Sequence, residues 1–327
     1  MEFKGALTGF DRRIWEEELE PFVPERIFDA HVHLWSDRHA GTNTDTGSAL
    51  RTDAGFQALD SWSRKIFPGR RLAYLLLGTP LPGMDVEGHN QFMAAECAES
   101  PAGLGSMITV PEMTADKLAE TVVKCRFRGL KPYRLFAARP AEARIADFFP
   151  EHQMEVADSL GLCVTLHLSR FHGIADPLNL DDLRFYTARY PKIRWILAHC
   201  ARAFNGFTLE KSIHRLRELP NIWYDTSAVC DDYAHFLLLK HENRKRILFG
   251  TDNIAAGSCR GKYVSWGKGW CFFQAEKQPH CLSENTLVVY EQLRAQKHAA
   301  DMAGLTTDEV ADIFYCNASR LFGLPPC

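Results

Sequence analysis

Eight short apolar runs of strand length, separated by segments with helical spacing, constrain this chain more than any other feature of its sequence. Runs such as "AYLLLG", "VTLHL" and "WILAH" show little alternation of apolar and polar residues. This pattern is typical of strands that are buried on both faces of a parallel sheet. The runs cover residues 26–34, 71–78, 103–110, 129–136, 162–168, 193–198, 221–228 and 246–250.

The segments between these runs predict amphipathic helices. Examples are "TADKLAETVVKCRF", "EHQMEVADSL", "LDDLRFYTARY" and "TLEKSIHRLREL", with Thr114, Asp181 and Thr208 near the expected helix starts. Eight alternating strand–helix units favour an α/β fold closed into a (β/α)₈ TIM barrel. An open doubly wound sheet is the alternative, but no Gly-x-Gly-x-x-Gly motif follows the first run.

A chain of 327 residues suits a single barrel domain with extensions. Residues 1–25 contain "DRRIWEEELEPFVP", which predicts an amphipathic helix that ends before Pro21 and Pro24. We therefore expect an N-terminal helical extension at 1–25 and the barrel, including its C-terminal helices, at 26–327. The extension could clamp the barrel or pair subunits, so a homo-oligomer is possible.

Charge and composition argue against some classes of binding partner. The 38 basic and 41 acidic residues include no long basic run, which argues against nucleic-acid binding. No apolar stretch reaches the roughly 20 residues of a membrane span, and the N-terminus lacks the pattern of a signal peptide. Ten scattered cysteines without a Cys-x-x-Cys pair indicate mostly reduced thiols. We expect a cytoplasmic protein with a small-molecule substrate.

Histidines and a carboxylate gather at the ends of the predicted strands. Alternation along the first strand puts His31 and His33 on one face. His167 ends the fifth strand, His199 ends the sixth, and Asp252 follows the eighth, all at the rim that carries barrel active sites. Any one of these histidines could be an ordinary hydrogen-bonded core residue. Together they predict a divalent metal site, with zinc favoured and manganese possible.

Five segments carry a resemblance to a known family: "FDAHVHLW", "TLHLS", "ILAHCAR", "RILFGTDN" and "NASRLFGL". In this order and spacing they resemble the amidohydrolase superfamily, and within it the amidohydrolase 2 branch of metal-dependent hydrolases and decarboxylases. The resemblance implies a metal held by His31, His33, His167 and Asp252. It implies that His199 is a further ligand or the residue that handles protons.

Two reactions are compatible with such a site. In hydrolysis of a small carboxylated or polyhydroxylated lactone, amide or ester, Asp252 would accept a proton from metal-activated water while His199 stabilises the oxyanion. In decarboxylation, an acid would protonate the carbon that loses carbon dioxide. The segments "HCARAFNG" and "TDNIAAG" lack the glycine and proline context typical of the branch's decarboxylases, which favours hydrolysis. A metal-independent lactonase and a non-catalytic barrel are further alternatives.

The fourth and sixth strand ends supply candidate substrate contacts. Lys131, in "RGLKPYRLF", could be carbamylated and bridge two metals, bind a substrate carboxylate, or face solvent. The side chains of Tyr133 and Arg134 could likewise point into the barrel or toward solvent. Arg202 could grip a carboxylate with its planar guanidinium, or form a surface salt bridge.

The segments after the seventh and eighth strands supply further candidates. Arg260, Lys262 and Trp266, together with Lys268 and Trp270, would suit an anionic or sugar-like substrate, although lysines in glycine-rich loops often serve only solubility. The segment "YDTSA", with Asp225, Thr226 and Ser227, could orient metal ligands or form a layer of the barrel core.

Overall fold

The structure, a computed structural model, describes residues 5–41, 52–274 and 284–326. Eight parallel strands pair in the order of the chain. The last strand returns to the first, because Ala30 N donates to Phe249 O at 2.9 Å and Asp252 N donates to His31 O at 2.8 Å. The predicted (β/α)₈ barrel is confirmed. Its strands are β1 Arg26–Leu34, β2 Arg71–Gly78, β3 Gly105–Thr109, β4 Gly129–Pro132, β5 Cys163–Leu166, β6 Arg194–Leu197, β7 Ile222–Asp225 and β8 Ile247–Leu248.

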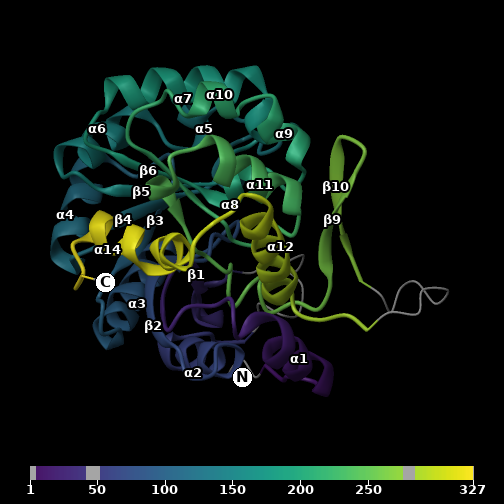
Figure 1. Cartoon of the computed structure of the whole chain (residues 1–327). Helices are drawn as coiled ribbons and strands as arrows, with labels where there is room; N and C mark the ends of the chain where they lie inside the picture. The colour runs from purple at the N-terminus through teal and green to yellow at the C-terminus, as the bar shows by residue number, and fades with distance from the viewer. Residues whose placement is uncertain (1–4, 42–51, 275–283, 327) are drawn as a thin grey trace.

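Helices surround the strands (Figure 1). They are α2 Phe56–Ile66, α3 Val86–Glu99, α4 Ala115–Cys125, α5 Ile145–Phe148, α6 Glu151–Ser159, α7 Pro177–Arg189, α8 Ala198–Arg202, α9 Gly206–Glu210, α10 Ile213–Leu216, α11 Asp232–His241, α12 Val288–Met302, α13 Thr307–Ala311 and α14 Asn317–Phe322. In the described residues no helix is long and apolar enough to cross a membrane.

One of the three predicted helix starts is confirmed and two are wrong. Thr114 caps α4, as its side chain accepts from Lys117 N. Asp181 lies inside α7, which begins earlier because Asp176 caps it and proline occupies the first turn. Thr208 lies inside α9, which Asn205 caps, and the single helix expected there is divided into α9 and α10.

The segment before β1 is helical, with α1 Gly9–Ile14 continued by one π-helical turn, Trp15–Leu19. Trp15 packs against Phe67, at the end of α2, with ring centroids 6.0 Å apart, and against Tyr290 of α12 at 6.2 Å. The segment is therefore fixed to two helices of the same barrel.

A β-bulge in β1 sets the direction of the site histidines. The pairing with β2 shifts by one residue between Asp29 and Val32. Before the bulge, Phe28 belongs to the apolar cluster inside the barrel; after it, Val32 belongs to the cluster between sheet and helices. His33, on the face opposite to Val32, therefore points inward. Simple alternation along the whole strand would have turned the Phe28 ring outward instead.

The two ends of the barrel differ. The interior cluster continues into the C-terminal segment, where Phe28 stacks on Phe322 with centroids 5.4 Å apart. The C-terminal helices thus close the amino-terminal end of the barrel. The carboxyl ends of the strands carry the histidines and Asp252, so the site lies at the opposite end.

A β-hairpin follows β8, in the glycine-rich segment that the sequence analysis treated as a loop. Its strands are β9 Lys262–Trp266 and β10 Gly269–Phe273, and it stands beside the barrel near α12 (Figure 1). The two residues between the strands include Gly267 with φ +53°, a conformation that short hairpin turns favour. The short "WGKGW" sequence contains this turn signal.

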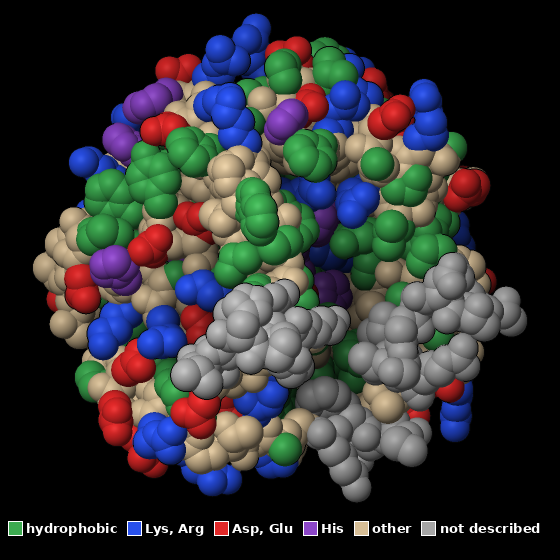
Figure 2. All heavy atoms as spheres, turned by 90° about the vertical axis from the view of Figure 1, so that its right-hand side faces the viewer, with side chains coloured by type: hydrophobic (Ala, Val, Ile, Leu, Met, Phe, Trp, Pro, Cys, Tyr) green, Lys and Arg blue, Asp and Glu red, His purple; other side chains and the backbone are tan. Residues whose placement is uncertain are grey.

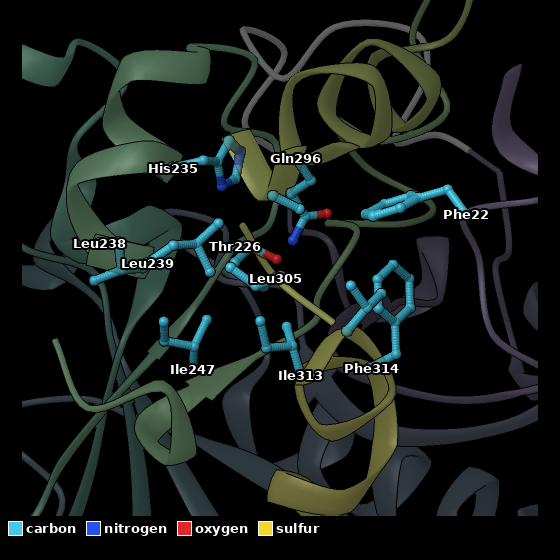
Figure 3. A pocket seen from close by; sticks show the side chains of 12 residues that line it. Phe22, Thr226, His235, Leu238, Leu239, Ile247, Gln296, Leu305, Ile313 and Phe314 are labelled. Atoms are coloured by element: carbon cyan, nitrogen blue, oxygen red, sulfur yellow. The ribbon is translucent and has the colours of Figure 1, made fainter. Parts of the chain in front are cut away.

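Seven cysteines of the described part carry free thiols, while Cys316 is disulfide-bonded. A cavity of about 20 Å³, room for one water molecule, lies between α11, α12 and the segment 312–316 (Figure 3). The side chain of Thr226 points into this cavity, and its hydroxyl has no hydrogen-bond partner.

Candidate metal centre

The structure brings His31, His33 and Asp252 together at the carboxyl end of the barrel. The Nε2 atoms of the two histidines lie 3.1 Å apart. One carboxylate oxygen of Asp252 lies 3.4 Å from His33 Nε2 and 3.8 Å from His31 Nε2. These ligand atoms from β1 and from the residues after β8 all lie close enough to hold a single metal ion.

Each site histidine directs its Nδ1 atom toward an oxygen. His31 Nδ1 lies 2.9 Å from Asp225 Oδ2, and His33 Nδ1 lies 3.1 Å from Gly78 O. His199 Nδ1 lies 2.9 Å from Ser227 O, and His167 Nδ1 lies 3.0 Å from Leu168 O. A carbonyl or carboxylate oxygen only accepts, so Nδ1 carries a proton in each ring, which leaves Nε2 as the nitrogen that can bind a metal.

The donor set fits a cation. Burial lowers the pKa of His33 well below its usual value, so this ring is neutral. Its Nε2 lone pair faces His31 Nε2 and the Asp252 carboxylate, three electron-rich groups that need a shared proton or a cation between them. Two neutral imidazoles and a carboxylate are the ligands that zinc prefers, and manganese accepts them as well.

Asp225 and Ser227 hold His31 and His199 in place through hydrogen bonds. Asp225 Oδ2 fixes His31, and Asp225 Oδ1 accepts the backbone N–H groups of His199 and Ser227, both at 3.1 Å. Ser227 Oγ donates to Asp225 Oδ1 at 2.5 Å and lies 2.9 Å from His199 Nδ1. Such carboxylate–histidine pairs hold imidazoles in the orientation that a metal requires. Thr226 takes no part, because its side chain points into the cavity of Figure 3.

Asp252 is fixed by its backbone. Its φ of +60° lies in the left-handed region, which costs a non-glycine residue about 1–2 kcal/mol. Hydrogen bonds to β1 hold this conformation: Thr251 N and Thr251 Oγ1 donate to Asp29 at 2.9 and 2.5 Å, and His33 N donates to Asn253 O at 2.5 Å. The carboxylate is therefore held in one place relative to the histidines of β1.

Burial also changes the charges of the site. It raises the pKa of Asp252 to about 6, with His31 and Lys131 acting in the opposite direction. It lowers the pKa of Lys131 to about 8 and that of His199 to about 3. At neutral pH His199 is therefore neutral, whereas Lys131 still carries a proton. Its ammonium nitrogen lies 3.4 Å from His31 Nε2, on the inner face of the barrel.

His167 and His199 lie beside the three-residue group. The His199 ring centroid lies 4.9 Å from that of His31 and 5.1 Å from that of His167. In the part of the chain that the structure describes, no group of three potential ligand atoms within 4.8 Å of one another includes a nitrogen of His167. His199 does form such a group, with His31 and Asp225, but Asp225 is already engaged with His31 Nδ1.

Tyr133 and Arg202 lie near His167. Tyr133 has its ring centroid 4.9 Å from the His167 ring and 5.7 Å from Lys131 Nζ. Arg202 Nη1 donates to Ser169 O at 3.1 Å and to Arg170 O. Of the predicted substrate contacts, Lys131, Tyr133 and Arg202 are thus the ones that the structure places around the histidines.

The other predicted contacts are engaged elsewhere or exposed. Arg260 donates to Asp11 of α1 at 2.6 Å, an ion pair with a carboxylate that is fully buried. Lys262 Nζ lies 3.4 Å from Glu291 of α12. Trp266, at the end of the hairpin strand β9, is 78% exposed. These contacts bind Arg260 to α1 and Lys262 to α12, and a substrate contact by either residue stays a prediction.

Aromatic residues that the sequence analysis missed extend from His199 to the hairpin. The Phe204 ring centroid lies 5.2 Å from that of His199, 4.9 Å from that of Tyr263 and 4.6 Å from that of Trp270. The carboxylate of Asp252 contributes to raising the pKa of Tyr263, after burial. No motif marks Phe204 or Tyr263, because only the hairpin brings them together.

Figure 2 shows the side of the molecule on which the hairpin stands. Histidine side chains are visible within a hollow, with lysine or arginine side chains beside them and hydrophobic side chains around. The arrangement can hold a divalent cation at its base and an anionic, partly apolar molecule above it.

Comparison with known proteins identifies relatives of the same fold. The probable 2-pyrone-4,6-dicarboxylic acid hydrolase of Acinetobacter baumannii superimposes with a TM-score of 0.59 at 15% identity, over 91% of this chain and 99% of that one. The 5-carboxyvanillate decarboxylase of Sphingomonas paucimobilis gives 0.54 at 15% identity, over 92% and 100% of the two chains. A 2,6-dihydroxybenzoate decarboxylase gives 0.56 at 13% identity, over 92% and 99%. At these identities the likeness establishes the fold alone.

A search of curated proteins found no match. The amidohydrolase family model, in contrast, matches residues 28–324. The match extends from the first barrel strand to the end of the last helix and includes every histidine of the cluster. This chain therefore belongs to the amidohydrolase family of enzymes.

Proposed function

We propose that this enzyme is a metal-dependent hydrolase that opens a lactone, ester or amide bond in a small carboxylated molecule. The observation that carries the proposal is the position of the Asp252 carboxylate, one oxygen of which lies 3.4 Å from His33 Nε2, beside the histidines that would hold the metal. A carboxylate held next to metal-bound water suits the removal of a proton from that water.

His31, His33 and Asp252 would hold the metal, with His167 and His199 as further candidate ligands; zinc is the first choice and manganese the second. When bound, a divalent cation lowers the pKa of water and polarises a carbonyl oxygen. Asp252 would accept the proton of the attacking water and pass it to the leaving group.

His199 suits a role other than the oxyanion stabiliser expected from its sequence position. Its Nδ1 proton points to Ser227 O, so its Nε2 offers a lone pair and not a proton. We assign His199 as a ligand or a proton acceptor. Lys131, a buried cation 3.4 Å from His31 Nε2, is the group available to stabilise negative charge on the substrate oxygen.

The relatives support an acidic substrate, because their names refer to a pyrone dicarboxylic acid, a carboxyvanillate and a dihydroxybenzoate. Two of them are decarboxylases. Decarboxylation is therefore the second candidate, in which protonated Asp252 would supply a proton to carbon. A cytoplasmic location and a homo-oligomer stay predictions.

The test measures metal content and reaction together. Protein purified without chelators is analysed by mass spectrometry for metal, then assayed with lactones and N-acyl compounds for released acid, and with hydroxylated aromatic acids for released carbon dioxide. We expect about one equivalent of metal, its loss in His33→Ala, and loss of acid release in Asp252→Asn with an unchanged circular dichroism spectrum. Carbon dioxide release alone would replace hydrolase by decarboxylase, and full activity without metal would refute the metal-dependent mechanism.

A further inference from the structure

Arg134 and Arg202 are two cations near the histidine cluster that lack a carboxylate partner. Within the described part of the chain, neither guanidinium takes part in an ion pair. The nearby Arg144 and Arg170 do, with Asp182 and Asp176 respectively. Partly buried cations are normally paired, so two unpaired ones in one region require an explanation.

The two arginines approach the same residues from different strands. Arg134 begins the short 3₁₀ helix Arg134–Phe136, directly after Tyr133, which forms a β-bridge with His167. Arg202 reaches the same region from the end of α8, through its bonds to Ser169 O and Arg170 O just after His167. The Tyr133 and His167 rings therefore lie in the region that both arginines approach.

Both guanidinium groups have free donors. Among the residues that the structure describes, buried Arg134 Nε has no hydrogen-bond partner, and Arg134 Nη1 makes only a long contact of 3.4 Å to Pro140 O. Arg202 uses Nη1 for the two carbonyls, and in the described residues no partner is found for its Nε and Nη2. A buried donor without an acceptor destabilises the protein, and an anionic ligand that accepts its hydrogen bond would remove this cost.

The charges of these residues act on one another. Burial, together with the charge of Arg134, lowers the pKa of Arg202 to about 10. Burial lowers the pKa of His167 well below its usual value, and His199, Arg202, Lys131 and Arg134 act in the same direction. The region is therefore electropositive, and an anion placed there would be attracted by both arginines.

We propose that Arg134 and Arg202 form a carboxylate-binding subsite beside Tyr133, separate from His31, His33 and Asp252, for an acidic group remote from the bond that reacts. This inference rests on the proposed function, because it places the reacting bond at His31, His33 and Asp252. A planar guanidinium donates two parallel hydrogen bonds to a carboxylate, which suits arginine here better than lysine. Substrates with one acidic group at the metal and none beyond it would bind weakly.

The experiment measures binding of ring acids to the metal-loaded enzyme by calorimetry. The probes are isophthalate, which has two carboxylates, its half-amide 3-carbamoylbenzoate, and phenyl phosphate. The variants are Arg134→Gln and Arg202→Gln. Arg139→Gln is the matched control, because Arg139 lies in the same loop, is exposed, and pairs with Glu142.

We expect isophthalate to bind at least tenfold more tightly than its half-amide, and both variants to remove this difference while Arg139→Gln keeps it. Equal binding of isophthalate and its half-amide by the native enzyme would overturn the subsite, as would equal effects of Arg134→Gln and Arg139→Gln. Tighter binding of phenyl phosphate than of isophthalate would overturn its assignment to carboxylates. Metal content, measured on the same samples, reports separately on the proposed hydrolase centre.

Discussion

At the scale of single residues, hydrogen bonds to the Nδ1 atoms decide what the site histidines can do. The orientation of His31 depends on Asp225, a buried carboxylate; burial alone would raise its pKa, but the interactions with His31, His199 and Ser227 together outweigh burial and lower it. His199 depends on Ser227, which is itself fixed by the same carboxylate. One aspartate thus orients two imidazoles without belonging to the metal-ligand group formed by His31, His33 and Asp252.

Asp225→Asn should weaken metal binding by about 10- to 100-fold, because an amide can turn its NH₂ toward His31 Nδ1 and no longer fixes the proton on that atom. Metal affinity is measured by titration of the metal-free protein, with circular dichroism as a check of folding. Thr226→Val, one position along the chain, is the control, because Thr226 faces the cavity of Figure 3. Unchanged affinity in Asp225→Asn would show that the orientation of His31 does not depend on this carboxylate.

At the scale of elements, left-handed backbone occurs in two different settings. Residues His199, Cys200, Ala201 and Arg202 all have φ between +51° and +60°, a left-handed turn at the end of β6. It directs His199 to the cluster and Arg202 to the carbonyls of residues 169 and 170. Arg126, at the end of α4, has φ +57° but is exposed and makes no such contacts. Of these two segments, only residues 199–202 place side chains at the site.

Arg126→Gly should raise the free energy of unfolding by about 0.5–1 kcal/mol, since glycine adopts this helix-terminating conformation without steric cost. Activity should not change. Gly161→Ala is the reverse test after α6: its φ is +59° and an added Cβ would meet nothing within 4 Å, so only backbone strain is introduced. Chemical denaturation measures both. A less stable Arg126→Gly protein would contradict the argument.

At the scale of the whole molecule, one buried ion pair joins the N-terminal helix to the residues after β8. Asp11 accepts hydrogen bonds from Arg260, from Thr286 Oγ1 at 2.7 Å and from Thr8 N. Burial acts to raise the pKa of Asp11, but these bonds outweigh it and lower the pKa from 3.8 to about 2. Residues far apart in the sequence are thereby fixed next to the hairpin.

Asp11→Asn should reduce stability at neutral pH by about 2 kcal/mol and reduce the loss of stability in acid. A carboxyl group with a lowered pKa contributes its full stabilisation at pH values above its pKa in the unfolded chain, 3.8. This contribution is lost as the pH falls through the pKa in the folded protein, about 2. Denaturation of both proteins between pH 7 and pH 2 measures the difference. A difference that stays constant over this range would show that Asp11 does not titrate as argued.

The sequence by itself determined the barrel and most of the site. Buried apolar runs and helical spacing specify the alternation of strands and helices, and strand ends locate His31, His33, His199 and Asp252, because parallel strands present their carboxyl ends on one rim. The helix cap at Thr114 could be predicted for the same reason, because Thr114 bonds a residue three positions along the chain. These features depend on residues that are near one another in the chain.

Only the tertiary structure decided how these residues are used. The bulge in β1 sets the inward direction of His33, the β7 residue Asp225 selects the proton position of His31, and the hairpin brings Tyr263 to Phe204. Arg260 could not be assigned from sequence, because its partner Asp11 lies 249 positions away. Such contacts join distant segments, and their geometry depends on the closure of the barrel, which no local pattern encodes.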